Sequence, residues 1–80
     1  MMKAKVYVTL KSGVLDPQGK AVQHSLESLG FSEVKGVRIG KYIEVVLEET
    51  DRNKASERMK AMCEKLLANT VIESYKFELE

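Results

Sequence analysis

The residues best suited to chemistry lie in one short connecting segment between two apolar stretches, GVLDPQGKAV at positions 13–22. It holds two glycines, the only proline of the chain and the carboxylate of Asp16. Glycine-rich segments cradle phosphates when their spacing fits a P-loop or a dinucleotide-binding motif, and these two glycines fit neither. The segment is therefore interpreted as a helix start, with Asp16 as the N-terminal cap and Pro17 at the first helical position.

The chain has one histidine, His24, and one cysteine, Cys63. His24 is expected on the polar side of the first helix, and Cys63 falls on the apolar stripe of the second. A nucleophilic cysteine needs a base beside it, and a metal centre needs more ligands of these types than one histidine and one thiol. His24 is interpreted as a solvated side chain and Cys63 as a small core residue.

Acidic residues cluster at Glu48, Glu49 and Asp51, where a predicted strand ends. Their spacing does not fit a calcium-binding loop, and a charged strand end discourages edge-to-edge aggregation. Glu73 interrupts an apolar stretch, so an opposite charge is expected beside it, and structural pairing is favoured over a binding role. We predict no catalytic residue, no metal ligand and no cofactor-binding residue in this chain.

Hydrophobic periodicity predicts the elements that position these residues. Strands alternate apolar and polar side chains, whereas amphipathic helices repeat apolar ones every three to four residues. The predicted order is a strand from residue 4 to 11, a helix at 17–29, strands at 33–39 and 42–49, a helix from residue 50 or 51 to 66, and a strand at 71–80. This β-α-β-β-α-β order predicts one α+β domain over residues 1–80. It is typical of two layers, an antiparallel sheet with both helices on one face, and favours a ferredoxin-like strand order.

Three local signals set the expected element ends. Gly40-Lys41 has the glycine-first sequence that a two-residue type II′ hairpin prefers. Gly30 is expected to end the first helix in the left-handed conformation, with Phe31 closing over the last turn. Asn69 is expected to play the left-handed role after the second helix.

Composition narrows the classes of partner. Thirteen Lys and Arg against twelve Asp and Glu give a net charge of +1, which argues against nucleic acid as the main partner. A single cysteine excludes an internal disulfide and favours a reducing compartment, so we expect the cytoplasm. No stretch approaches the ~20 apolar residues of a membrane span, and no membrane partner is expected. A chain of 80 residues has a thin core, so self-association is expected.

The sheet face opposite the helices is expected to be open and to lean apolar. Such a face on a small domain marks an interface. Two copies are expected to pack through it or to extend each other's sheets, as a homodimer or homotetramer. The predicted interface residues are Tyr7, Thr9, Asp16, Pro17, Arg38, Lys41, Tyr42 and Val46.

Three stretches, VTLKSGVLDPQGKAV, LGFSEVKGVRIGKYIEV and MCEKLLANTVIESYKFELE, carry a family resemblance. In order and spacing the chain resembles the PurS family, the small subunits of phosphoribosylformylglycinamidine synthase. The most specific parts are LDPQG at 15–19 and LLAN at 66–69. Thr70 departs from the family pattern, which commonly has proline there, and this departure is expected to alter the local turn.

The resemblance implies a PurS-like fold and a non-catalytic role in de novo purine biosynthesis. It implies two partners, a glutaminase subunit that releases ammonia and a large synthetase subunit that uses ammonia to convert formylglycinamide ribonucleotide into its amidine. This chain would join them and assist ammonia transfer, while ATP and magnesium would serve the synthetase. Two alternatives stay open, a small-ligand-binding regulatory module of the same fold and an RNA-binding sheet.

Overall fold

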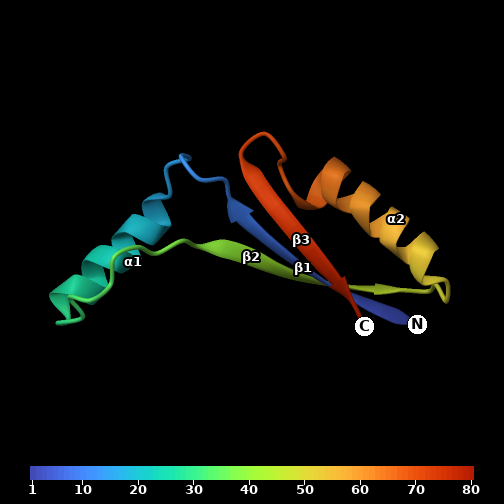
Figure 1. The fold of residues 1–80 in the computed structure, drawn as a ribbon, viewed down its shortest axis with the longest axis horizontal. Coiled ribbons are helices and arrows are strands. Elements are labelled where there is room, and N and C mark those ends of the chain that lie inside the picture. Colours follow the sequence, from blue (N-terminus) through green and yellow to red (C-terminus); the bar gives the residue numbers. More distant parts are fainter.

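A computed structural model describes residues 1–80 and divides them into three strands and three helical segments (Figure 1). Their bounds in chain order are β1 Met2–Leu10, α1 Pro17–Ser28, β2 Gly40–Leu47, α2 Arg52–Met62, the π-helical turn η1 Cys63–Leu67, and β3 Glu73–Leu79. The α+β class with an antiparallel sheet is confirmed. Neither helix combines the length and the apolar content that crossing a membrane requires.

The sheet has the order β2-β1-β3, and both strand pairs are antiparallel. Val6 in the central strand lies opposite Ile43 on one side and Phe77 on the other. Side chains alternate between the two faces of each strand, as the sequence periodicity predicts. One face therefore carries the apolar residues of all three strands, and the other carries mainly polar and aromatic ones.

The core lies between the apolar sheet face and α2. Val6 and Val8 pack there with Met59 and Cys63, all at most 1% exposed. Only 8 of the 80 residues are buried, so the expectation of a thin core is confirmed. A core of this size leaves little hydrophobic free energy to offset the loss of chain entropy.

Local capping agrees with the sequence at three helix ends. Asp16 caps α1, and Asp51 caps α2 by accepting hydrogen bonds from the next backbone N–H groups. Gly30 has a φ of +98°, and the N–H of Phe31 donates to the carbonyl of Leu26 at 3.0 Å. This pair of features is a Schellman motif, which satisfies the last carbonyl groups of α1.

The end of the second helical segment differs from the prediction. Apart from glycines, no residue has a positive φ, so the left-handed role assigned to Asn69 is wrong. The π-helical turn η1 ends the segment instead, and Ala68 is extended. The Asn69 side chain accepts from the N–H of Val71 at 3.2 Å, and its backbone N–H donates to Glu73 at 2.6 Å. These bonds stabilise the turn into β3 without a left-handed residue.

Two expectations about the middle of the chain are also wrong. Residues 33–39 form no strand, so the hairpin at Gly40-Lys41 is absent and the sheet has three strands. The backbone N–H of Ile39 donates to the Asp16 carboxylate at 2.9 Å. That bond ties the segment to the start of α1. It also occupies the N–H of Ile39, which is then unavailable for pairing with a neighbouring strand.

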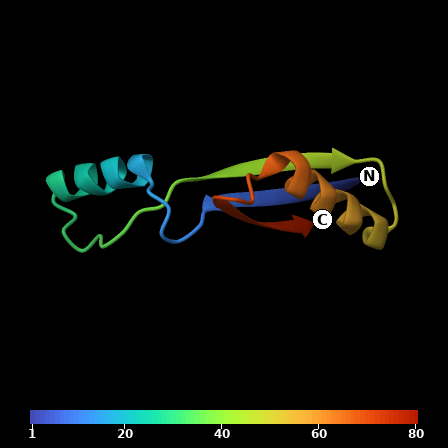
Figure 2. The same ribbon diagram turned by 90° about the horizontal axis from the view of Figure 1, so that it is seen from above.

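The expectation that both helices lie on one face of the sheet is also wrong for the single chain, because α1 does not share a sheet face with α2. Figures 1 and 2 show α1 beyond the end of the sheet, and it packs extensively against no other element. We name residues 11–39, which hold α1 and its two connecting segments, the α1 arm. The radius of gyration is 16.1 Å, whereas a compact chain of this length has about 12 Å.

Candidate functional site

The sheet face opposite α2 is the first candidate surface, and we name it the open face. Strand alternation and register place ten residues on it, Lys3, Lys5, Tyr7, Thr9, Tyr42, Glu44, Val46, Ser74, Lys76 and Glu78. Four of the predicted interface residues therefore lie on one surface, Tyr7, Thr9, Tyr42 and Val46. No helix of the same chain covers this face (Figure 2).

Two tyrosines lie near the centre of the open face. Tyr7 and Tyr42 are opposite each other in the β1–β2 register, with ring centroids 5.3 Å apart and ring planes 39° from parallel. The Lys76 ammonium lies 5.3 Å from the Tyr7 centroid, within reach of a cation–π interaction. Paired aromatic rings lose little conformational entropy when a partner binds, which suits them to an interface.

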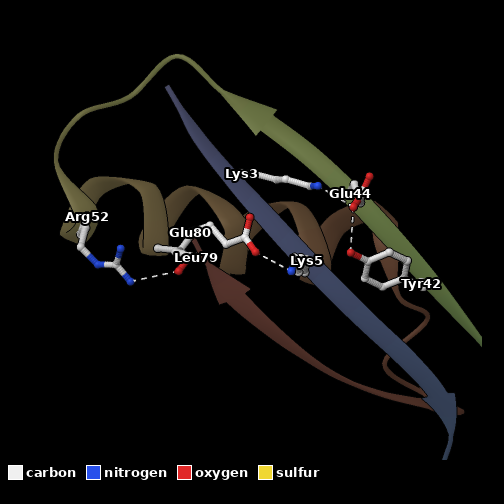
Figure 3. A network of polar contacts seen from close by, with 7 residues as sticks. All are labelled: Lys3, Lys5, Tyr42, Glu44, Arg52, Leu79 and Glu80. Atoms are coloured by element: carbon white, nitrogen blue, oxygen red, sulfur yellow. Dashed lines mark hydrogen bonds and ion pairs between the residues drawn. The ribbon is translucent and has the colours of Figure 1, made fainter.

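Ion pairs lie on the same face as Tyr42, and Figure 3 shows Tyr42 beside Glu44 and Lys3. Glu44 pairs with Lys3 at 2.8 Å and accepts the Tyr42 hydroxyl at 2.9 Å. The Lys3 hydrogen bond, followed by that of Tyr42, lowers the pKa of Glu44. Lys5 forms a second pair with Glu80. The open face is therefore charged and aromatic, and the expectation that it leans apolar is wrong.

The Asp16 joint is the second candidate site. Oδ1 of Asp16 accepts the N–H of Gly19 at 2.8 Å, and Oδ2 accepts the N–H of Ile39 at 2.9 Å. These two bonds, Ile39 first, lower the pKa of Asp16. Both carboxylate oxygens are thus engaged by backbone donors. The geometry supports the interpretation of Asp16 as the N-terminal cap of α1. Neither carboxylate oxygen is left free for a ligand.

A shallow hollow of about 260 Å³ lies beside this joint, and it brings together Thr9, Asp16, Pro17 and Lys41 from the predicted interface. Glu73 lines the same hollow, with its Oε2 3.7 Å from the Lys41 ammonium. The prediction of a charge partner for Glu73 is therefore confirmed. In this hollow Lys41 and Glu73 pair with each other, and Asp16 accepts backbone N–H groups.

Arg38, the remaining predicted interface residue, lines an adjacent hollow of about 500 Å³, which shares Leu10 and Asp16 with the first. Lys11, Lys20 and Lys35 line it too, so four cations from three segments surround one depression. Sequence reasoning missed this basic hollow, because its cations are scattered along the chain and the net charge is only +1. Its presence gives the α1 arm a local positive field.

The other residues with chemical potential stand apart. His24 lies in a shallow polar depression on α1, whereas Cys63 is buried under α2. Burial is the main cause that raises the pKa of the Cys63 thiol, which keeps it protonated and weakly nucleophilic. No three histidine, cysteine or acidic side chains lie close enough together to hold a metal ion.

The chain matches known proteins over nearly its whole length. The family model described as PurS, phosphoribosylformylglycinamidine (FGAM) synthase, matches residues 3–80. The PurS subunit of Bacillus subtilis (strain 168) is 60% identical over 80 residues, covering 100% of this chain and 94% of that protein. The PurS subunit of Methanocaldococcus jannaschii is 44% identical, covering 100% of this chain and 96% of that protein.

Solved structures agree along the whole chain. A B. subtilis PurS crystal structure gives a TM-score of 0.89 at 60% identity, covering 100% of this chain and 99% of that one. The structure of PurLQS from Thermotoga maritima gives a TM-score of 0.87 at 32% identity, with 100% and 99% coverage. The chain therefore belongs to the PurS family of phosphoribosylformylglycinamidine synthase subunits, which serve purine biosynthesis.

Proposed function

We propose that this chain is a non-catalytic subunit of phosphoribosylformylglycinamidine synthase that joins the glutaminase subunit to the ATP-dependent synthetase subunit. The observation that carries the proposal is its likeness, over the entire chain, to a structure of PurLQS from T. maritima. The side-chain geometry supports it, because the Asp16 carboxylate serves as a cap and the Cys63 thiol is buried. The chain therefore contributes to the synthase through its shape and not through a catalytic group.

Assistance with ammonia transfer is part of the proposal. Ammonia that reaches neutral water is mostly protonated and loses its nucleophilic lone pair, so transfer requires a water-excluding path between two active sites. A rigid subunit between the glutaminase and the synthetase aligns the ends of such a path. The paired side chains of the open face favour rigidity, since Tyr42 and Lys3 are both fixed by Glu44.

The open face is the proposed contact with the partner subunits. Interfaces are enriched in tyrosine, and specific interfaces carry complementary charges that fix orientation. Tyr7, Thr9, Tyr42 and Val46 provide the aromatic and aliphatic contacts, and Val46 is 66% exposed. We assign no cofactor to this chain, and ATP and magnesium belong to the synthetase. The cytoplasmic location stays a prediction.

Reconstitution tests this function. The chain is mixed with purified glutaminase and synthetase subunits, and amidine formation is measured with glutamine or with ammonium salt as the nitrogen source. We expect the chain to raise the glutamine-dependent rate at least tenfold and to change the ammonium-dependent rate much less. This difference is expected because free ammonia reaches the synthetase without a path from the glutaminase.

Charge substitution tests the surface. Val46→Arg on the open face is expected to raise at least tenfold the chain concentration that gives half-maximal glutamine-dependent activity, because an unpaired charge is costly in an interface. Glu57→Arg, at an exposed position of α2, is the matched control and is expected to change it less than twofold. Equal effects of the two variants would contradict the assignment of the open face.

The regulatory-module alternative makes a different prediction. Under that alternative the isolated chain binds glutamine or a nucleotide, and the hollow beside Asp16 is the candidate location. Isothermal calorimetry with the isolated chain measures this directly. Saturable binding abolished by Lys41→Ala would favour the regulatory module over the joining role.

A further inference from the structure

The basic hollow concentrates positive charge on a chain that is nearly neutral overall. Its lining holds four of the thirteen Lys and Arg side chains and only one of the twelve Asp and Glu side chains. Lys11 follows β1, Lys20 belongs to α1, and Lys35 and Arg38 lie in the segment that returns from α1 to β2. A concave surface lined by one sign of charge attracts ligands of the opposite sign.

None of these four cations forms an ion pair within the chain. The three ion pairs of the structure belong to Lys3, Lys5 and Lys41, and each of these lysines is matched with a glutamate. The four side chains are exposed, and the one hydrogen bond that any of them donates runs from the Lys35 ammonium to the carbonyl of Ser32 at 3.5 Å. The cations of the basic hollow therefore repel one another, and an anion placed among them reduces that repulsion.

The single acidic residue in the lining does not neutralise the four cations through ion pairs. The carboxylate of Asp16 accepts the backbone N–H groups of Gly19 and Ile39 at 2.8 and 2.9 Å, one on each oxygen. These bonds hold the carboxylate in the wall of the hollow and leave it no oxygen free to coordinate a metal ion. The donor set of the basic hollow therefore suits an anion that binds without a metal.

The size and lining of the hollow narrow the class of anion. Its volume of about 500 Å³ lies within the range of small-molecule sites, about 300–1,000 Å³. Arginine matches phosphate oxygens with paired N–H donors, and lysines act as point charges beside it. The Ser12 hydroxyl also lines the hollow and makes no hydrogen bond within the chain. No aromatic ring is present in the lining, so a nucleobase has no surface to stack on.

We propose that the basic hollow binds the phosphate chain of a small molecule that carries two or three consecutive phosphate groups. Such a chain has roughly one negative charge on each phosphate and a second on its terminal group, which matches the four cations in number. Inorganic polyphosphate and the phosphate chain of a nucleoside triphosphate share this chemistry. The nucleoside itself contributes little, because the lining offers it no ring.

A ligand bound in this way bridges the three segments that meet at the base of the α1 arm. Lys20 contacts it from α1, Lys11 from the end of β1, and Arg38 from the returning segment. Asp16 already joins two of these segments through its hydrogen bonds to Gly19 and Ile39. The phosphate chain adds a second joint, so the orientation of the α1 arm depends on the ligand. This inference goes beyond the joining role and does not depend on it.

Titration calorimetry of the isolated chain in magnesium-free buffer at low salt tests the proposal. Sodium tripolyphosphate is expected to bind once per chain and at least tenfold more tightly than inorganic phosphate, because its longer chain reaches more of the cations. ATP is expected to bind within threefold of tripolyphosphate, and adenosine is expected not to bind. An affinity for ATP at least tenfold higher than that for tripolyphosphate would overturn recognition of the phosphate chain.

Charge-removing variants locate the site. Arg38→Gln and Lys35→Gln are each expected to weaken tripolyphosphate binding at least fivefold. Lys54→Gln, at an exposed position of α2, removes the same charge outside the hollow and is expected to change the affinity less than twofold. Lys41→Ala, in the hollow beside Asp16, is expected to change it less than threefold. A loss in Lys54→Gln or Lys41→Ala as large as that in Arg38→Gln would overturn the assignment to the basic hollow.

Thermal unfolding measures the joint that the ligand forms. A ligand that binds only the folded chain raises its stability, so excess tripolyphosphate is expected to raise the melting temperature by several degrees. Sodium chloride at the same ionic strength is expected to leave it within one degree, since screening acts on all charges alike. The Arg38→Gln chain, checked for folding by circular dichroism, is expected to lose most of the shift.

Two results of these measurements would refute the phosphate site. One is the absence of saturable tripolyphosphate binding at millimolar concentration. The other is an equal shift of the melting temperature in the native and Arg38→Gln chains. All the measurements use the chain alone, so their failure is distinguishable from failure of the reconstituted activity.

Discussion

The Asp16 carboxylate and the Ile39 backbone N–H, 23 positions apart in the chain, are joined by a 2.9 Å hydrogen bond. The other carboxylate oxygen caps α1 through the N–H of Gly19 at 2.8 Å. One side chain therefore holds both the start of α1 and the end of the segment that returns from it. The base of the α1 arm is fixed by this double contact.

Asp16→Asn is expected to weaken the joint, because an amide has one accepting oxygen in place of two. The folded pKa of Asp16 is lowered from its ordinary value of 3.8, so its contribution to stability is present above that value and is lost as pH falls through the folded pKa. The melting temperature of the variant is expected to be several degrees lower at neutral pH, with a smaller difference in acid. Thermal unfolding by circular dichroism from about pH 2 to 7 measures both effects. Exposed Glu33→Gln serves as the control, and a difference that grows in acid would contradict the sign.

Gly19→Ala is expected to destabilise the chain through steric overlap. A Cβ at this position would collide with the backbone oxygen of Val37 and lie 2.6 Å from an Asp16 carboxylate oxygen. Overlap with backbone costs about 1–3 kcal/mol, measured by urea unfolding. Gly36→Ala is the matched control, since its Cβ meets nothing within 4 Å, and it is expected to change stability by at most about 0.5 kcal/mol. Equal losses in the two variants would show that Gly19 has no special packing role.

Cys63 is expected to resist thiol reagents in the folded chain. The side chain is fully buried, and burial, with a smaller effect of Glu64, raises its thiol pKa. The thiolate is the reactive form, so modification by a disulfide reagent is expected at least a hundredfold faster in urea than in buffer. Cys63→Ser is expected to cost about 1–3 kcal/mol, because it buries a hydroxyl among apolar neighbours, and Cys63→Ala is expected to cost less. Rapid labelling of the native chain would contradict this placement.

Tyr75 is expected to ionise at a higher pH than an ordinary tyrosine side chain. Hydrogen bonding with the Glu64 carboxylate, followed by burial, raises the pKa of Tyr75 to about 12. A raised folded pKa means that the contribution of Tyr75 is complete below the ordinary value of 10.0 and is lost as pH rises toward 12. Glu64→Gln is expected to move the Tyr75 transition toward that ordinary value, as followed by tyrosinate absorbance. Glu57→Gln is the control, and an unchanged transition in Glu64→Gln would exclude Glu64 as the cause.

The amino-acid sequence by itself determined the local features of this protein. Alternation in β1, β2 and β3 set which side chains face the core, because the pleat has a period of two whatever the strand pairs with. Asp16 and Gly30 set the ends of α1 for an equally local reason, since caps and left-handed turns involve residues at most a few positions away. The motifs that carry the family resemblance are likewise recognised from the sequence alone.

Only the tertiary structure decided how distant segments meet. The sequence of 33–39 with Gly40-Lys41 predicts a closed hairpin, yet the chain runs open, and the N–H of Ile39 bonds to Asp16 instead. Strand composition and turn chemistry cannot distinguish pairing within a chain from pairing between chains, because both use the same contacts. The π-helical end of α2 and the four cations of the basic hollow also depend on spatial neighbours. Hydrophobic periodicity could not predict these features, because it reflects the geometry of a single helix or strand and not the contacts between distant segments.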